Sequence, residues 1–183
     1  MHYNAIPTTF AGRQYRSRLE ARWAAFFHYL GWDAEYEPVD FAGWIPDFAL
    51  YGAKVVYVEV KPIVACDDAV TTKIDASGCE DEVLLVGQRP WCGETDFSCG
   101  WYLGWLREVY EYTDEQEGGI CWGHAVLGQW EQAATVGFCH EYQSYRDRIS
   151  GHYDGGCQGG RRLHDDQITG PWTRAVNASQ WRP

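Results

Sequence analysis

The sequence has no long uninterrupted apolar run, and its first residues carry no basic start followed by an apolar stretch. A membrane-spanning helix needs about 20 consecutive apolar residues, and a secretory signal needs that basic-then-apolar order. We therefore expect no contact with a membrane and no signal peptide.

Basic side chains are scarce, with 15 Lys and Arg against 26 Asp and Glu, so the net charge is −11. Such a balance argues against a protein that coats nucleic acid non-specifically. The charge is uneven, however. Residues 13–22 carry a local +3, residues 33–117 a local −14 and residues 146–183 a local +2. A basic helix and a basic tail on an acidic body can still bind phosphates.

Several catalytic and binding motifs are missing. There is no P-loop, no dinucleotide-binding fingerprint and no G-x-S-x-G elbow, although a Ser-His-Asp or Cys-His arrangement stays open. The seven cysteines are odd in number and scattered, so we interpret them as reduced thiols of a cytoplasmic protein. No C-x2-C pair exists, and the available pairs are Cys92 with Cys99, Cys121 with His124, and Cys139 with His140. Structural zinc sites use two closely spaced pairs, so we expect no bound zinc.

The chain is long enough, at 183 residues, for one compact domain with an appendage. Residues 14–30 form the clearest helix, because Leu19, Trp23, Phe26 and Leu30 recur at helical spacing and Gly31 follows as a stop. Glu20 lies at the edge of that apolar stripe.

The segments after this helix predict an α/β core. We expect strands at 32–38, 47–51, 54–61 and 82–87, with a short helix between Asp67 and Ala76. The hairpin of residues 47–61 is antiparallel, and the last strand joins parallel through the helix. We place the core in residues 1–90.

Residues 91–183 are predicted to form an extension that packs on the core. Strands are expected near 100–105 and 120–122, separated by an acidic turn at 113–119, and mostly irregular structure from Gly151 onward. The many Trp and Tyr after residue 100 could stack on splayed bases, but such residues more commonly fill a core.

The most informative residues are Pro46-Asp47 and Glu59-Val60-Lys61. Side chains alternate along a strand, so Glu59 and Lys61 project from one face while Val60 points away. Asp47 returns to the same end of the hairpin. Two carboxylates and an ammonium then converge, which suits a Mg²⁺ site for attack of water on a phosphodiester.

A Glu-bearing helix, P-D at one strand and E-x-K on the next resemble the PD-(D/E)XK nuclease superfamily. Residues 13–87 follow its α-β-β-β-α-β order. The segments 15–24, 36–38 and 45–48 are similar to small members from phages and actinobacteria. The resemblance implies a restriction-endonuclease-like fold, a mixed sheet flanked by helices.

The resemblance also implies roles for single residues. Asp47, Glu59 and the Val60 carbonyl would bind Mg²⁺, with Mn²⁺ as a substitute, and Glu20 would join them directly or through water. Lys61 would position the attacking water or steady the charge growing on the phosphate. The nucleic-acid contacts would come from basic side chains, namely Arg13, Arg16 and Lys73.

Plainer interpretations stay open for each of these residues. Glu59 and Lys61 could be an exposed pair on a half-buried strand, and Asp47 a turn acid after proline. Glu20 could be a solvated acid bonded to Arg16, and Lys73 a surface lysine. The basic residues 13–22 could be a solvated face.

The expected function is Mg²⁺-dependent hydrolysis of nucleic acid, DNA rather than RNA, by a nuclease that can pair as a homodimer. The alternative is a non-catalytic protein of the nuclease fold whose acidic face engages a protein partner or mimics DNA. A branched-DNA or mismatch endonuclease would differ only in substrate.

Overall fold

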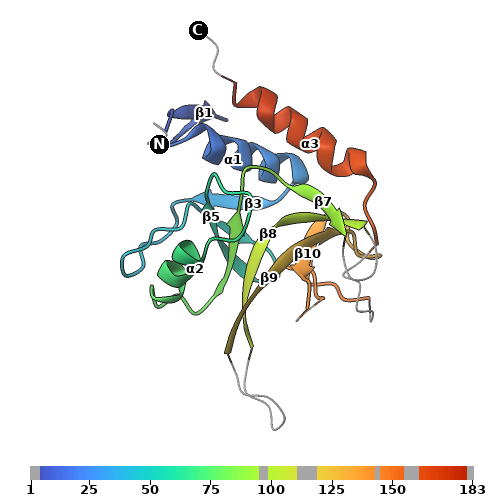
Figure 1. Ribbon diagram of the computed structural model, residues 1–183. Coiled ribbons are helices and arrows are strands. Elements are labelled where there is room, and N and C mark those ends of the chain that lie inside the picture. Colours follow the sequence, from blue (N-terminus) through green and yellow to red (C-terminus); the bar gives the residue numbers. More distant parts are fainter. Residues whose placement is uncertain (1–4, 95–98, 111–118, 143–144, 155–160, 181–183) are drawn as a thin grey trace.

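The structure, a computed structural model, describes residues 5–94, 99–110, 119–142, 145–154 and 161–180. It is a mixed α/β fold in which helices flank a curled mixed sheet (Figure 1). The helices are α1 (Arg18–Leu30), α2 (Asp68–Asp75) and α3 (Asp165–Ala178). The strands are β1 (Thr8–Phe10), β2 (Arg13–Tyr15), β3 (Asp33–Tyr36), β4 (Phe48–Tyr51), β5 (Val55–Val60), β6 (Glu82–Val86), β7 (Trp91–Glu94), β8 (Cys99–Tyr110), β9 (Gly119–Gly128) and β10 (Gly137–His140).

The main sheet has the strand order β10-β9-β8-β6-β5-β4-β3, and β7 adds to β8. The antiparallel pairing of β4 with β5 confirms the predicted hairpin. The parallel pairing of β5 with β6 confirms the predicted crossover through α2. The other strand pairs in the described ranges are antiparallel.

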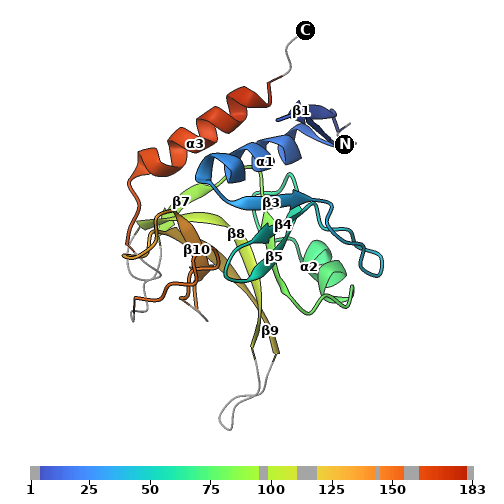
Figure 2. The ribbon, with the colours of Figure 1, turned by 180° about the vertical axis from the view of Figure 1, so that it is seen from behind.

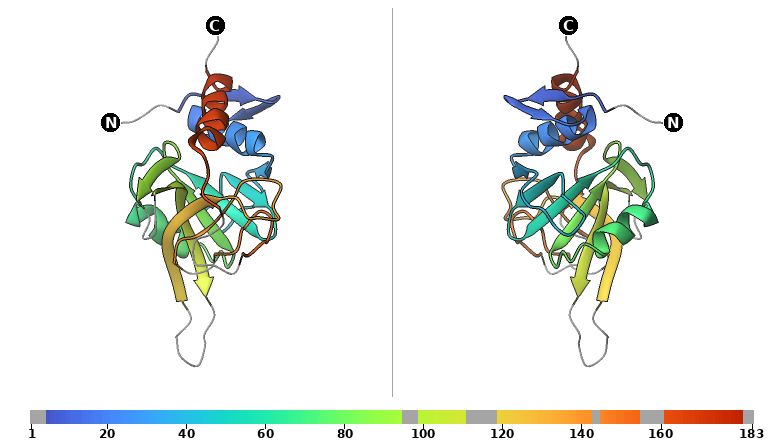
Figure 3. Two further views of the ribbon diagram at one scale, coloured as in Figure 1. Left: turned by 90° about the vertical axis from the view of Figure 1, so that its right-hand side faces the viewer. Right: turned by 90° about the vertical axis from the view of Figure 1, so that its left-hand side faces the viewer.

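Alternate residues of β5 contact different layers of the molecule. Val56, Val58 and Val60 belong to the large core that α1 covers, whereas Tyr57 packs with Ile74 of α2 in a smaller core. The helices α1 and α2 therefore lie on opposite faces of the sheet. Figure 2 and Figure 3 show α3 side by side with α1.

The first helix begins later than predicted, at Arg18, because Ser17 caps it by accepting a hydrogen bond from the Glu20 N–H at 3.1 Å. Residues 8–15 instead form the β1–β2 hairpin, which turns through Ala11 and Gly12, both at positive φ. The end of α1 is as predicted, since Gly31 adopts a left-handed φ of 76° and closes the helix.

The segment from Gly151 onward is not mostly irregular, as the sequence had suggested, because α3 occupies residues 165–178. Its Ile168, Trp172 and Ala175 pack into the core at helical spacing, despite Pro171 within the helix. The strands near 100 and 120 are confirmed as the longer β8 and β9. Because β8 pairs directly with β6, strands on both sides of residue 90 belong to one sheet. The acidic turn of 113–119 lies, except for Gly119, outside the described residues.

No helix within the described ranges is long and apolar enough to cross a lipid bilayer. Of the cysteines whose side chains are described, all are free thiols, namely Cys66, Cys79, Cys92, Cys121 and Cys139.

Candidate functional site: paired carboxyls at the open end of the hairpin

The register of the β4–β5 hairpin brings two acids together. Phe48 pairs with Val58, so one further step along both strands places Asp47 opposite Glu59 on the same face of the sheet. The two residues are only 3% and 6% exposed. Like charges directly opposite one another are unfavourable, which makes a buried pair of this kind an unusual feature for a plain structural hairpin.

Asp47 is tied down at both carboxyl oxygens. Its Oδ2 accepts a hydrogen bond from the Val60 N–H at 2.8 Å, and its Oδ1 accepts one from Arg16 Nη2 at 2.6 Å. Burial raises the pKa of Asp47 to about 7, and the neighbouring Glu59 adds to the rise. The Val60 N–H and the Lys61 ammonium oppose this rise without cancelling it. The Arg16 side chain is 56% exposed, so solvent weakens its electrostatic interaction with the Asp47 carboxyl.

Glu59 is held by two donors. Trp44 donates from Nε1 to Oε2 at 2.9 Å, and Lys61 donates from Nζ to Oε1. Val60 points the other way into the large core, so the predicted alternation of Glu59, Val60 and Lys61 is confirmed. The Lys61 side chain stays 37% exposed, and its Nζ also lies 3.4 Å from the Val60 carbonyl oxygen. An ammonium with that access can reach a ligand outside the protein.

Glu20 occupies the first turn of α1 and is buried. Its Oε2 accepts hydrogen bonds from the Tyr36 hydroxyl at 2.6 Å and from the Arg16 N–H at 3.2 Å. Burial and the bond to Glu20 raise the pKa of Tyr36 to about 12, so the phenol stays protonated as a donor. Glu20 is thus an ordered acid in the core margin and not a freely solvated one.

Arg16 joins the two acidic regions. Its guanidinium contacts Asp47 at 2.6 Å, Glu37 at 3.2 Å and Glu20 at 3.8 Å. Burial alone would lower its pKa, but these acids and Tyr36 raise it above the usual range. The sequence had predicted a phosphate contact for Arg16, and here the side chain lies on the carboxyls of its own chain.

The other predicted residues lie differently. Lys73 is exposed on α2, and Arg13 is exposed on β2. Three further residues support the site without a pattern in the sequence that predicts them: Trp44 orients Glu59, Tyr36 orients Glu20, and Glu37 contacts Arg16. Glu37 also has a positive φ of 48° and donates its N–H to the Asp47 carbonyl at 3.0 Å.

The donor set fits a hard divalent cation in its chemistry. Asp47 and Glu59 supply carboxyl oxygens, and their repulsion within a buried site is what a bound cation relieves. Glu20 is not gathered with them, since the described residues contain no group of three or more His, Cys, Asp or Glu side chains that could hold a metal. The pair is therefore the part of the predicted ligand set that the fold brings together.

Comparison of the chain with protein-family models, with curated proteins and with solved structures gives no match.

Proposed function

We propose that this protein is a Mg²⁺-dependent nuclease that hydrolyses phosphodiester bonds, with DNA as the preferred nucleic acid. The single observation that carries the proposal is the buried pair of Asp47 and Glu59, with the Lys61 ammonium on the same face. Two hard oxygen donors and a cationic hydrogen-bond donor at one edge are the groups that metal-assisted hydrolysis needs.

The order of elements is in line with this proposal. The stretch α1-β3-β4-β5-α2-β6 has antiparallel β3–β4 and β4–β5 pairs and a parallel β5–β6 pair. This is the order expected for a restriction-endonuclease-like core, and the acids lie where β4 begins and β5 ends.

Each residue of the site has a separate task in this proposal. Asp47 and Glu59 would hold the cation, which supplies Lewis acidity and lowers the pKa of water when bound. Lys61 donates hydrogen bonds to the attacking water or to the phosphate oxygens. Trp44 keeps Glu59 in place, and Tyr36 keeps Glu20 oriented toward Arg16. Pre-ordered supports of this kind keep the reacting groups in position.

A second candidate function is supported by the cations of the chain itself. Arg16 already contacts one carboxyl of the pair and Lys61 the other, so the site is electrostatically satisfied in part without a metal. A protein that only binds a partner with this face would keep that arrangement. Calorimetric titration with Mg²⁺ separates the two functions, because only the nuclease requires binding of the cation.

Replacing Lys61 by methionine tests the nuclease function. We expect wild-type protein with Mg²⁺ or Mn²⁺ to nick or degrade DNA, and EDTA to stop the reaction. The K61M variant should lose activity by about 10²-fold or more, because its ammonium is removed while the length of the side chain is kept. The measurement is release of end-labelled fragments from linear duplex, single-stranded, nicked and junction DNA.

The matched control is Lys54→Met at the turn of the same hairpin, where Lys54 pairs with Glu82 at 2.7 Å. This variant should cut at the wild-type rate. If K61M and K54M retain the same activity, the proposed role of the site is wrong.

A further inference from the structure

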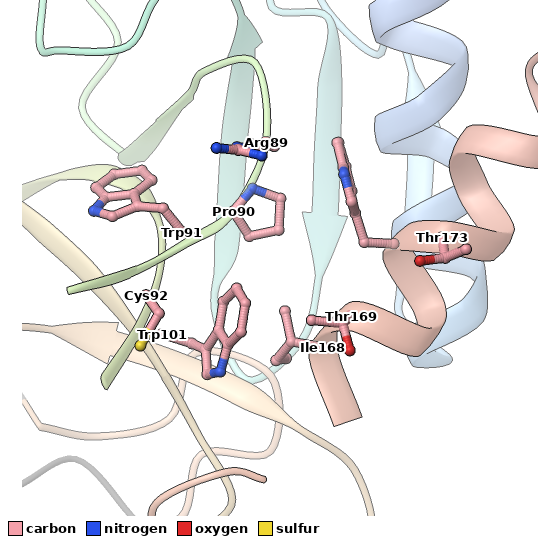
Figure 4. A pocket seen from close by; sticks show the side chains of 9 residues that line it. Arg89, Pro90, Trp91, Cys92, Trp101, Ile168, Thr169 and Thr173 are labelled. Carbon is pink, nitrogen blue, oxygen red and sulfur yellow. The ribbon is translucent and has the colours of Figure 1, made fainter. Parts of the chain in front are cut away.

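Two adjacent cavities of about 370 Å³ and 420 Å³ lie where α1, α3 and the chain around β7 meet. They share Arg89 and Trp172 in their linings, so they lie next to each other, and the two together are called the groove below. Figure 4 shows the first cavity, with Trp91, Trp101 and Arg89 arranged around it opposite α3.

The groove begins next to the end of β5, the strand that carries Glu59. Pro62, which directly follows Lys61, lines it together with Gln88. Gln88 fixes this end by donating its backbone N–H to the Ile63 carbonyl at 3.0 Å and its Nε2 to the Pro62 carbonyl at 3.3 Å. A chain lying in the groove would therefore pass the end of β5.

Three arginines line the second cavity, namely Arg18, Arg22 and Arg89. None of them forms an ion pair with a residue in the described ranges. The Nε of Arg18 is shielded from solvent and has no hydrogen-bond partner among those residues. Burial lowers the pKa of Arg22, and the charge of Arg18 lowers it further. A cluster of this kind, in a chain of net charge −11, is complementary to an anionic ligand.

Three half-buried indoles line the first cavity, namely Trp91, Trp101 and Trp172. The Nε1 of Trp101 donates to Asp165 at 3.1 Å, which fixes that ring. Trp172 packs against Trp23 with 4.9 Å between ring centroids, and Trp91 against Trp105 at 5.2 Å. These contacts fix the orientation of the three rings, so the rings are preorganised to stack on planar groups.

We propose that this groove binds single-stranded nucleic acid, with phosphates on the arginines and bases against the tryptophans. Cationic grooves lined by aromatic side chains bind single strands without strong sequence preference. In a duplex the bases are stacked on one another, so their faces cannot reach the indoles. An acidic peptide would satisfy the arginines but would leave the three indoles without a stacking partner.

This inference deepens the proposed function by naming the form of the substrate that reaches the site, and it rests on that function only for its catalytic meaning. Binding can be measured in EDTA, where hydrolysis does not occur. Failure of the groove and failure of the nuclease function are then separate results.

The test is fluorescence anisotropy of a labelled 12-nucleotide oligothymidine with the full chain in EDTA. Arg89→Ala and Trp101→Ala should each weaken binding by about 5-fold or more, since loss of one stacked base or one phosphate contact has at least this effect. Arg89→Ala should also reduce the dependence of log K on log salt concentration by about 0.7. Arg89 is exposed, so this variant tests the groove even if Trp101→Ala does not fold.

The matched controls are Arg174→Ala and Tyr153→Ala. Arg174 lies on α3 but over the ring of Tyr29, at 4.6 Å from its centroid, and Tyr153 is 52% exposed elsewhere. Wild-type affinity in both controls, with weaker binding in both groove variants, supports the inference. Equal affinity of Arg89→Ala and wild type, equal binding of duplex, or full displacement by polyglutamate each overturns it.

Discussion

Asp47→Asn is expected to lower the rate of metal-dependent hydrolysis by about 10³-fold or more while leaving the protein folded. The asparagine oxygen can still accept the Val60 N–H that Asp47 Oδ2 accepts at 2.8 Å, so the start of β4 stays paired with the end of β5. The exposed Arg16 can turn toward Glu37, which it already contacts at 3.2 Å. The substitution removes the negative charge that a cation requires and changes little else.

The same substitution should alter how stability depends on pH. The folded pKa of Asp47 is raised from 3.8 to about 7, first by burial and then by Glu59. Between these values the folded protein keeps a proton that the unfolded chain has lost. The free energy of unfolding therefore falls as pH rises through this window and levels off above about 7. Asp47→Asn has no such carboxyl, so this part of the decrease should disappear.

Urea denaturation at pH 5 and pH 8, together with the nuclease assay, measures both effects. Asp40→Asn is the matched control, because it is the same substitution at an exposed residue in the loop between β3 and β4. It should keep the wild-type activity and pH dependence. Unchanged hydrolysis in Asp47→Asn would show that Asp47 is not part of the site. An unchanged pH dependence of the free energy of unfolding would show that the Asp47 carboxyl does not have the raised pKa.

The hairpin could be predicted from the sequence because its signals are local. Alternation along β5 fixes Glu59 and Lys61 on one face, and the chain length between Asp47 and Glu59 fixes their pairing. The contacts of Arg16 with Asp47 and of Trp44 with Glu59 depend on where α1 and a loop settle. No periodic pattern encodes such contacts.

The last helix shows a different limit. Ile168, Trp172 and Ala175 already stand at helical spacing, which could have predicted α3. Gly170 and Pro171 in the middle of this pattern oppose a helix by local propensity. Packing against α1 outweighs that propensity, and the sequence alone does not show that α1 is the neighbour.

The largest effect on stability is expected at Arg148, whose side chain is 1% exposed. Its Nε contacts Glu82 Oε2 at 2.6 Å, its Nη2 lies 3.1 Å from Glu108 Oε2, and its Nη1 donates to the Arg146 carbonyl at 2.7 Å. Glu82 and Glu108 lie on β6 and β8, and both are buried. Arg148 thus neutralises two acids of the central sheet from a segment that follows β10.

Arg148→Met should lower the free energy of unfolding by about 3–5 kcal/mol, because it leaves two buried carboxylates with one fewer cation. Urea denaturation at pH 7.5 measures this loss, and Arg146→Met is the matched control, since Arg146 is exposed two residues earlier. The control should differ from wild type by no more than about 0.5 kcal/mol.

Adding Glu82→Gln and Glu108→Gln to Arg148→Met should restore much of the loss, because the unpaired charges are then gone. If Arg148→Met and Arg146→Met are equally stable, the buried ion pairs do not hold residues 145–150 on the sheet. If the triple variant is no more stable than Arg148→Met, the packing of the arginine side chain, and not its charge, fixes this segment on β6 and β8.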